Sequence, residues 1–189
     1  MIPPFLAEGF DVKALESDES TLIALDTECI VLWTNPAWAR FAVSNGGADV
    51  LNRFGAGTSY LLGVSEALRG FYKAAFGNAL ETGAPFEQDY ECSSPEAFRM
   101  FHLRALPFEG KGLLLEHSLI DVRPHQQIAF EPHSRAYARA NGTILQCSNC
   151  RRVRRPLAAA WDWIPSWVRH PPSNVSHGLC SLCLGFYWG

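Results

Sequence analysis

Residues 21–41 read TLIALDTECIVLWTNPAWARF, and this stretch decides the fold of the larger part of the chain. Two apolar, partly β-branched runs, 22–25 and 29–33, flank a short polar break, a pattern that predicts a β-hairpin. Asn35 is a favourable N-cap residue and Pro36 suits the first position of a helix, so we expect a short helix as far as residue 41. The segment thus predicts strand, strand and helix in succession.

Further along the chain, apolar periodicity predicts one long helix and three strands. In residues 65–82 apolar side chains recur at three- and four-residue steps, which indicates one buried helical face. Residues 86–92, 98–108 and 113–122 are expected to be strands. The second strand alternates clearly, with apolar side chains at Phe101, Leu103 and Ala105 and polar ones at His102 and Arg104. This order of elements predicts an α+β fold, an antiparallel sheet with helices on one face.

The segment 21–41, with its strand pair and its Asn-containing turn into a helix, resembles the opening of a PAS domain. Residues 86–122 resemble the closing three strands of that family, and the resemblance covers residues 15–123. It implies a sensory or protein-interaction module, which in many members holds a small ligand between sheet and helices and in many members dimerises. The Asn-Cys-Arg-Phe stretch of flavin photoreceptors does not occur in the sequence. Haem is disfavoured, because residues 65–82 contain no His, while His102 and His117 fall on expected strands.

Charge is distributed unevenly along the 189 residues, whose formal net charge is −3. Residues 1–140 carry 11 basic and 18 acidic side chains, whereas residues 141–189 carry five Arg and a single acid, Asp162. A change of this size indicates two units with different roles. We expect four regions along the chain: an N-terminal lead over 1–14, a PAS-like domain over 15–123, a linker with a helical piece over 124–144, and a four-cysteine zinc module over 145–189.

The sequence carries no pattern for membrane insertion or secretion. No apolar run approaches the roughly 20 residues that span a bilayer, and residues 1–10 have no basic segment followed by an apolar one. We therefore expect a cytoplasmic protein with reduced cysteines and no membrane span. Cys29 and Cys92 fall on expected strands and are predicted to be buried, free thiols. His125 and His133 lie in the linker and are expected to be solvated.

Four of the six cysteines form two CxxC pairs, Cys147 with Cys150 and Cys180 with Cys183, with 29 residues between the pairs. One CxxC turn lets two thiolates reach a metal ion, and two such turns complete a tetrahedral Zn²⁺ site. Because the protein would fill all four positions, we predict one structural zinc per chain. An iron–sulfur cluster is an alternative, as is a redox switch that releases zinc on oxidation. His177 could replace one cysteine as ligand or make a hydrogen bond in its own turn.

The stretches CSNCRRVRR, WDWIPSWV and SHGLCSLC resemble a tail that follows PAS or receiver modules in bacterial two-component-type signalling proteins. This resemblance covers residues 145–189 and implies a zinc-binding module in a signalling chain. Ser181 stands where the family pattern has Pro. The aromatic residues of the tail could form its own core, or a face that docks a partner: Trp161, Trp163, Trp167, Phe186, Tyr187 and Trp188.

These patterns together predict a non-catalytic signal-transduction protein. Its PAS-like domain is expected to sense an unidentified small ligand or to scaffold a signalling partner, and it could form a homodimer. No P-loop and no Ser-x-x-Lys or Gly-x-Ser-x-Gly nucleophile occurs, and no kinase or output domain follows, so we expect no enzyme activity. One alternative is a nucleic-acid-binding regulator that uses Arg151–Arg155. We do not expect nucleic acid as the partner, because the negative charge of a zinc–thiolate centre offsets part of the tail's positive charge.

Overall fold

The computed structural model of the protein divides into two compact units, and each unit consists of two segments of the chain. Residues 1–46, 48–125 and 132–188 are described. Unit 1 consists of Met1–Tyr90 and Phe101–Ile120, and unit 2 of Glu91–Met100 and Asp121–Gly189. The domain boundaries expected after residues 14, 123 and 144 stay a prediction. Among the described residues, no helix is both long and apolar enough to cross a membrane.

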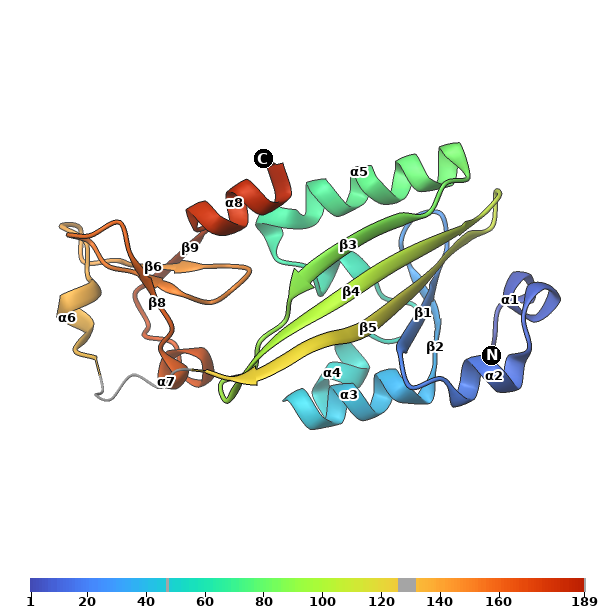
Figure 1. Cartoon of the computed structure of the whole chain (residues 1–189), viewed down its shortest axis with the longest axis horizontal. Helices are drawn as coiled ribbons and strands as arrows, with labels where there is room; N and C mark the ends of the chain where they lie inside the picture. Colours follow the sequence, from blue (N-terminus) through green and yellow to red (C-terminus); the bar gives the residue numbers. More distant parts are fainter. Residues whose placement is uncertain (47, 126–131, 189) are drawn as a thin grey trace. The chain divides into compact units, whose positions relative to one another are not determined.

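A five-stranded sheet with the order β2-β1-β5-β4-β3 is the framework of unit 1 (Figure 1). Antiparallel pairing places Ile23 of β1 beside Thr34 of β2 on one side and Leu115 of β5 on the other. This arrangement confirms the predicted hairpin and the predicted fold class, an antiparallel sheet with helices. The strands are β1 (Thr21–Leu25), β2 (Val31–Thr34), β3 (Phe86–Glu91), β4 (Ala97–Phe108) and β5 (Gly112–Pro124).

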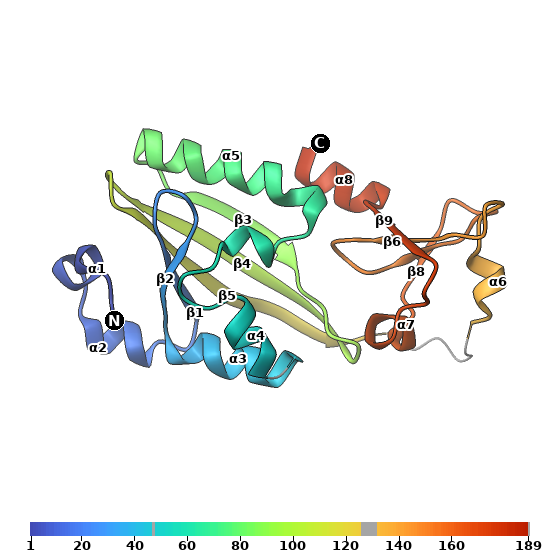
Figure 2. The ribbon, with the colours of Figure 1, turned by 180° about the vertical axis from the view of Figure 1, so that it is seen from behind.

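Helix α4 lies in front of the sheet in Figure 2, α3 runs below the sheet in both ribbon views, and α5 runs alongside β3. The apolar face predicted for residues 65–82 is confirmed in α5, where Leu68, Tyr72, Phe76 and Ala79 are buried. The helix ends at Gly83, whose φ of 72° is left-handed and suits glycine. The helical segments of unit 1 are α1 (Pro4–Gly9), α2 (Val12–Ser17), α3 (Pro36–Gly46), α4 (Ala48–Arg53), η1 (Tyr60–Leu62) and α5 (Glu66–Thr82).

Asn35 does more than the N-cap role that its position predicts. Its Oδ1 accepts hydrogen bonds from the backbone N–H of Trp38 and from that of Leu22, each at 3.1 Å. Its Nδ2 donates to the Ser20 carbonyl at 2.9 Å. The side chain is 1 % exposed, so a buried amide joins the start of β1 to the start of α3, and both faces of that amide are satisfied.

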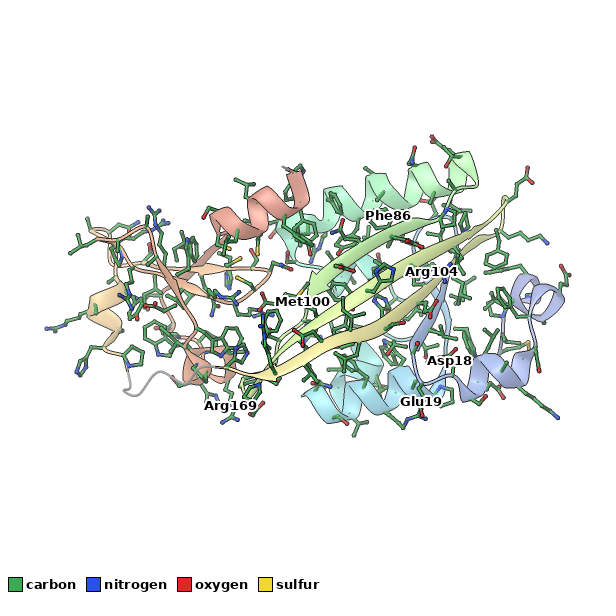
Figure 3. All side chains as sticks on the ribbon, viewed as in Figure 1. Asp18, Glu19, Phe86, Met100, Arg104 and Arg169 are labelled. Atoms are coloured by element: carbon green, nitrogen blue, oxygen red, sulfur yellow. The ribbon has the colours of Figure 1, made fainter. Side chains whose placement is uncertain are left out.

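The two faces of the sheet differ as the alternation in β4 predicts. Phe101, Leu103 and Ala105 are buried. On the opposite face Arg104, labelled in Figure 3, pairs with Glu87 of β3 at 3.0 Å and with Glu116 of β5 at 3.5 Å. Part of this face is covered by residues from the expected N-terminal lead and from α2, which form an apolar cluster with β1 and β5: Phe5, Leu6, Leu15, Leu22, Ala24 and Leu114.

Cys29 corrects one sequence expectation, because it lies in the hairpin turn and not on a strand. The Asp26 carboxylate accepts hydrogen bonds from the N–H groups of Glu28 and Ile30, and this tight turn delays the start of β2 to Val31. Cys29 takes a left-handed φ of 63° and is buried. Cys92, also expected on a strand, is half-buried and follows the last residue of β3.

Unit 2 contains a four-stranded sheet of short strands with the order β8-β7-β6-β9. Its core consists of Tyr137, Ile144, Val153, Ile164 and Trp167. The elements are α6 (Ser134–Tyr137), β6 (Ile144–Cys147), β7 (Val153–Arg154), β8 (Trp161–Asp162), α7 (Pro165–Arg169), β9 (Val175–Gly178) and α8 (Ser181–Trp188). The helical piece predicted in the linker is α6, and the part of that linker at 126–131 lies outside the described residues.

The aromatic residues of the tail differ in burial, and whether the exposed ones dock a partner stays a prediction. Trp163, Trp167 and Tyr187 are buried, whereas Phe186 and Trp188 are each about half exposed. His125 was expected to be solvated, but its ring stacks on Trp163 with centroids 4.0 Å apart. The sequence could not indicate this contact, because the two residues are distant in the chain and neither belongs to a motif.

Candidate metal centre

Parallel pairing of β6 with β9 brings the two CxxC turns together. Cys147, the last residue of β6, lies in register with Gly178, the last residue of β9. The N–H and the hydroxyl of Ser148 both donate to the Gly178 carbonyl, each at 2.8 Å. Cys180 follows two residues after that glycine, and Cys183 lies in the first turn of α8. Strand pairing thus closes the 29-residue gap between the pairs.

The four thiols predicted as ligands converge in the structure. The Sγ atoms of Cys147, Cys150, Cys180 and Cys183 all lie within 4.8 Å of one another, and all four residues are buried. The Sγ atoms of Cys150 and Cys180 are 3.7 Å apart. A tetrahedral zinc site with Zn–S bonds of about 2.3 Å has sulfur–sulfur edges of about 3.8 Å. The donor set and its spacing therefore fit a four-coordinate Zn²⁺, and all six cysteines of the chain are free thiols.

Hydrogen-bond donors surround the sulfur atoms. The N–H of Cys180 points to Cys147 Sγ at 3.4 Å, that of Cys183 points to Cys180 Sγ at 3.3 Å, and Asn149 Nδ2 points to Cys183 Sγ at 3.4 Å. Hydrogen bonds from Cys150 and Cys183 lower the pKa of the Cys147 thiol, while hydrogen bonding to Cys147 raises the pKa of Cys183 to about 12. A bound cation would favour the ionised form of all four thiols.

Arg152 forms a second layer around the cysteines. Its guanidinium donates from Nη1 to Glu91 Oε2 at 2.9 Å, and the nearby Cys150 sulfur also favours its charged form. Both partners of this ion pair are largely buried, with side-chain exposures of 24 % for Arg152 and 13 % for Glu91. Burial opposes the charge of Arg152, and the interactions with Glu91 and Cys150 outweigh that effect, so its pKa is raised. Outer partners of this kind orient and tune metal ligands.

The other arginines of the run after Cys150 have different surroundings. Arg155 donates from Nη2 to Asp162 Oδ1 at 3.0 Å, and the same carboxylate accepts a hydrogen bond from the Tyr137 hydroxyl at 2.7 Å. Arg151 and Arg154 are exposed. Arg151 takes a left-handed φ of 63° and donates its N–H to the Cys147 carbonyl at 3.0 Å, which tightens the first CxxC turn. Two of the four arginine side chains, those of Arg152 and Arg155, are therefore paired within unit 2.

His177 does not join the cysteines. It lies on β9 in register with Gln146 and is exposed. Among the described residues, the group with metal-ligand geometry contains only cysteines. Sequence reasoning missed Glu91 and Asn149. The position of Asn149 inside a CxxC turn could have suggested its role. Nothing in the sequence indicates that Glu91 lies near the cysteines, because it is at the end of β3, far away in the chain.

A polar cluster lies inside unit 1. His117, expected on a strand, is on β5 and is 8 % exposed. Its Nδ1 is 2.8 Å from the Tyr90 hydroxyl and its Nε2 is 3.5 Å from the Tyr60 hydroxyl. Burial lowers the pKa of His117 to about 4, so the ring is neutral at pH 7. His102, also considered at the sequence level, lies on the other face of β4 and pairs with Asp89 at 2.7 Å.

No family model and no curated protein matches this chain. Solved structures with similarity to it include the PAS domain of BvgS from Bordetella pertussis, at 15 % identity and a TM-score of 0.46, over 58 % of this chain and 82 % of that one. A PAS domain from Colwellia psychrerythraea has 10 % identity and a TM-score of 0.45, over 57 % and 92 % of the two chains. The Vibrio cholerae VqmA dimer has 8 % identity and a TM-score of 0.44, over 67 % and 63 %.

Proposed function

We propose that this chain is a non-catalytic signalling protein in which Cys147, Cys150, Cys180 and Cys183 hold one structural Zn²⁺. The observation that carries the proposal is the convergence of four buried thiols within 4.8 Å. Four protein ligands complete the tetrahedron that zinc prefers in structural sites, which leaves no position for a catalytic water. The zinc would cross-link unit 2 and stabilise its fold, and it would take no part in a reaction.

Unit 2 has a physical need for such a cross-link. Its strands are only two to four residues long, and its principal apolar cluster contains five buried residues. Small units with cores of this size usually depend on a metal or on disulfides for stability, and the cysteines here are free. Zinc binding would therefore be coupled to the folding of unit 2.

The test is metal analysis of the freshly purified full chain together with two serine variants. We expect about one zinc per chain and no visible absorption in the wild type. Cys180→Ser should lose zinc, whereas Cys92→Ser, which removes a half-buried thiol outside the cluster, should retain it. Iron with a visible absorption band, or equal zinc loss in both variants, would contradict the proposal.

The sensing role belongs to unit 1 in this proposal. Its support is the PAS-like order of elements in the sequence and the neutral, buried His117 between two tyrosines. Such a group could recognise a small ligand by hydrogen bonding. A partner protein or a second copy of the chain would then receive the signal. Native mass spectrometry of the purified full chain tests this role: a retained small molecule that is lost in His117→Phe supports sensing, and a ligand-free protein favours a scaffold.

Nucleic-acid binding is the second candidate, and exposed Arg151 and Arg154 are the observation that favours it. Its weakness is that Arg152 and Arg155 are already paired within unit 2. Binding to DNA or RNA that falls steeply with salt and is lost on replacing Arg151 and Arg154 would support this function. The redox alternative would instead show zinc release at low peroxide concentration.

A further inference from the structure

A pocket in unit 2, separate from the cysteine cluster, combines two arginines with an apolar lining. It has a volume of about 270 Å³. The residues that line it include Tyr137, Arg139, Leu145, Arg154, Pro156 and Leu157. They come from the end of α6, the turn that follows it, β6, β7 and the turn after β7. The pocket thus lies where several short segments of one unit meet.

The backbone holds both arginines in place. Arg139 donates its N–H to the Thr143 carbonyl at 2.8 Å, and Gly142 donates back to the Arg139 carbonyl at 2.8 Å, so a closed turn fixes the start of this side chain. Gly142 has a left-handed φ of 79° there. Arg154 is on β7 next to buried Val153, and alternation along the strand directs it away from the core. Arg139 therefore lies in a hydrogen-bonded turn and Arg154 on a strand.

Among the described residues, neither guanidinium group has an anionic partner. Every described carboxylate of unit 2 already pairs with another arginine: Glu91 with Arg152, Glu96 with Arg169, Asp121 with Arg123 and Asp162 with Arg155. In the described ranges, neither Arg139 nor Arg154 makes an ion pair or a side-chain hydrogen bond. The described acids of the unit are thus paired elsewhere, and two arginines line the same pocket.

The lining determines what kind of anion would fit. Leu145 and Pro156 supply apolar surface, and Leu157 is 102 % exposed, so an occupant with an apolar body would bury it. Paired arginines recognise carboxylates through forked hydrogen bonds. A nucleic-acid backbone would use the charges but would leave the apolar lining exposed to water.

We propose that this pocket binds a small organic carboxylate, with its acid group between Arg139 and Arg154 and its apolar body against Leu145, Pro156 and Leu157. The inference goes beyond the proposed function, because it assigns a ligand site to unit 2 that does not involve the cysteines. The pocket volume of about 270 Å³ lies just below the range of about 300–1,000 Å³ typical of pockets for drug-sized ligands, so a smaller organic acid suits it.

The experiment is an NMR titration of the isotope-labelled full chain, observed at the arginine Nε–H and at the leucine methyl groups. Phenylacetate is the probe, and neutral phenylacetamide and inorganic phosphate are the matched comparisons. We expect saturable shifts at Arg139, Arg154 and Leu157 with a dissociation constant on the order of 1 mM. Phenylacetamide and phosphate should each bind at least about tenfold more weakly.

Variants separate the pocket from general charge. Arg139→Gln and Arg154→Gln should each weaken phenylacetate binding about tenfold, and Leu157→Ser should weaken it with no change in charge. Arg135→Gln removes an exposed arginine of α6 that does not line the pocket, and it should leave binding unchanged. Zinc content, measured on each variant, should stay as in the wild type, which keeps this test independent of the metal proposal.

Three results would overturn the inference. They are the absence of saturable shifts with phenylacetate, phosphate binding as tight as phenylacetate with no effect of Leu157→Ser, and equal weakening by Arg135→Gln. An oligonucleotide that shifts the same arginines far more strongly than phenylacetate, and that phenylacetate does not displace, would also overturn it and would favour the nucleic-acid function.

Discussion

Acidification should destabilise unit 1 through His117. The His117 ring is buried and hydrogen-bonded to the hydroxyls of Tyr60 and Tyr90. Burial lowers its pKa from 6.5 to about 4. In the unfolded chain the same ring takes up a proton at about pH 6.5. Between these two pH values the unfolded state therefore binds more protons than the folded state, and stability falls as the pH is lowered through this range.

The size of the effect follows from the difference between the two pKa values. One pH unit of difference corresponds to about 1.36 kcal/mol, so a folded-state pKa of about 4 against 6.5 corresponds to about 3 kcal/mol. The contribution of the neutral His117 ring to the free energy of unfolding should be fully present above pH 6.5 and almost entirely lost at pH 4. This is a large fraction of the stability of an ordinary domain.

The assay is urea unfolding at several pH values, followed by the methyl resonances of Leu103 and Leu115, which lie in the core of unit 1. His117→Gln serves as the reference, because other titrating groups act equally in both proteins. We expect the stability advantage of the wild type over this variant to shrink by about 3 kcal/mol from pH 7 to pH 4. A constant advantage over this range, or a His117 ring that titrates near pH 6.5 in the folded protein, would refute the reasoning.

Three further substitutions test other contacts by urea unfolding. Asn35→Ala removes a buried cap and should cost about 2–3 kcal/mol; Asn35→Asp should cost at least as much, because a carboxylate oxygen would replace the Nδ2 that donates to the Ser20 carbonyl. Gly112→Ala should cost more than about 3 kcal/mol, because its φ is 145° and a β-carbon would overlap a carbonyl oxygen of β1; Gly110→Ala, in open space at φ 63°, should cost only about 1 kcal/mol. Arg152→Gln should destabilise unit 2 by about 2 kcal/mol and loosen zinc binding, whereas exposed Arg151→Gln should change little. Equal losses within either matched pair would contradict these assignments.

The sequence was sufficient for elements whose signals are local. The hairpin over 22–33, the long helix α5 and the alternation in β4 each arise from side chains within one segment, and all were confirmed. The four cysteines could be named as candidate metal ligands for the same reason, since each CxxC turn is a local unit. Their convergence also needed the parallel pairing of β6 with β9, which no local pattern predicts.

What the sequence missed depends on contacts between distant segments. The apolar residues of the N-terminal helices carry no indication of which face of the sheet they cover. His125 has no motif that would indicate its stacking on Trp163. Cys29 was placed on a strand because its neighbours are β-branched, but backbone hydrogen bonds to the Asp26 side chain convert that position into a turn.

The pair Glu91 and Arg152 shows why a structural zinc would matter beyond unit 2's own core. Glu91 is the last residue of β3, a strand whose earlier residues belong to unit 1. Arg152 donates a hydrogen bond to this carboxylate, and the Cys150 sulfur also favours its positive charge. If zinc leaves, the thiols take up protons and Arg152 loses an anionic neighbour, so its position between the two becomes less favourable. Loss of the metal would then weaken the contact between Arg152 and Glu91 at the end of β3. A zinc- or redox-dependent signal would require a structural effect of this kind.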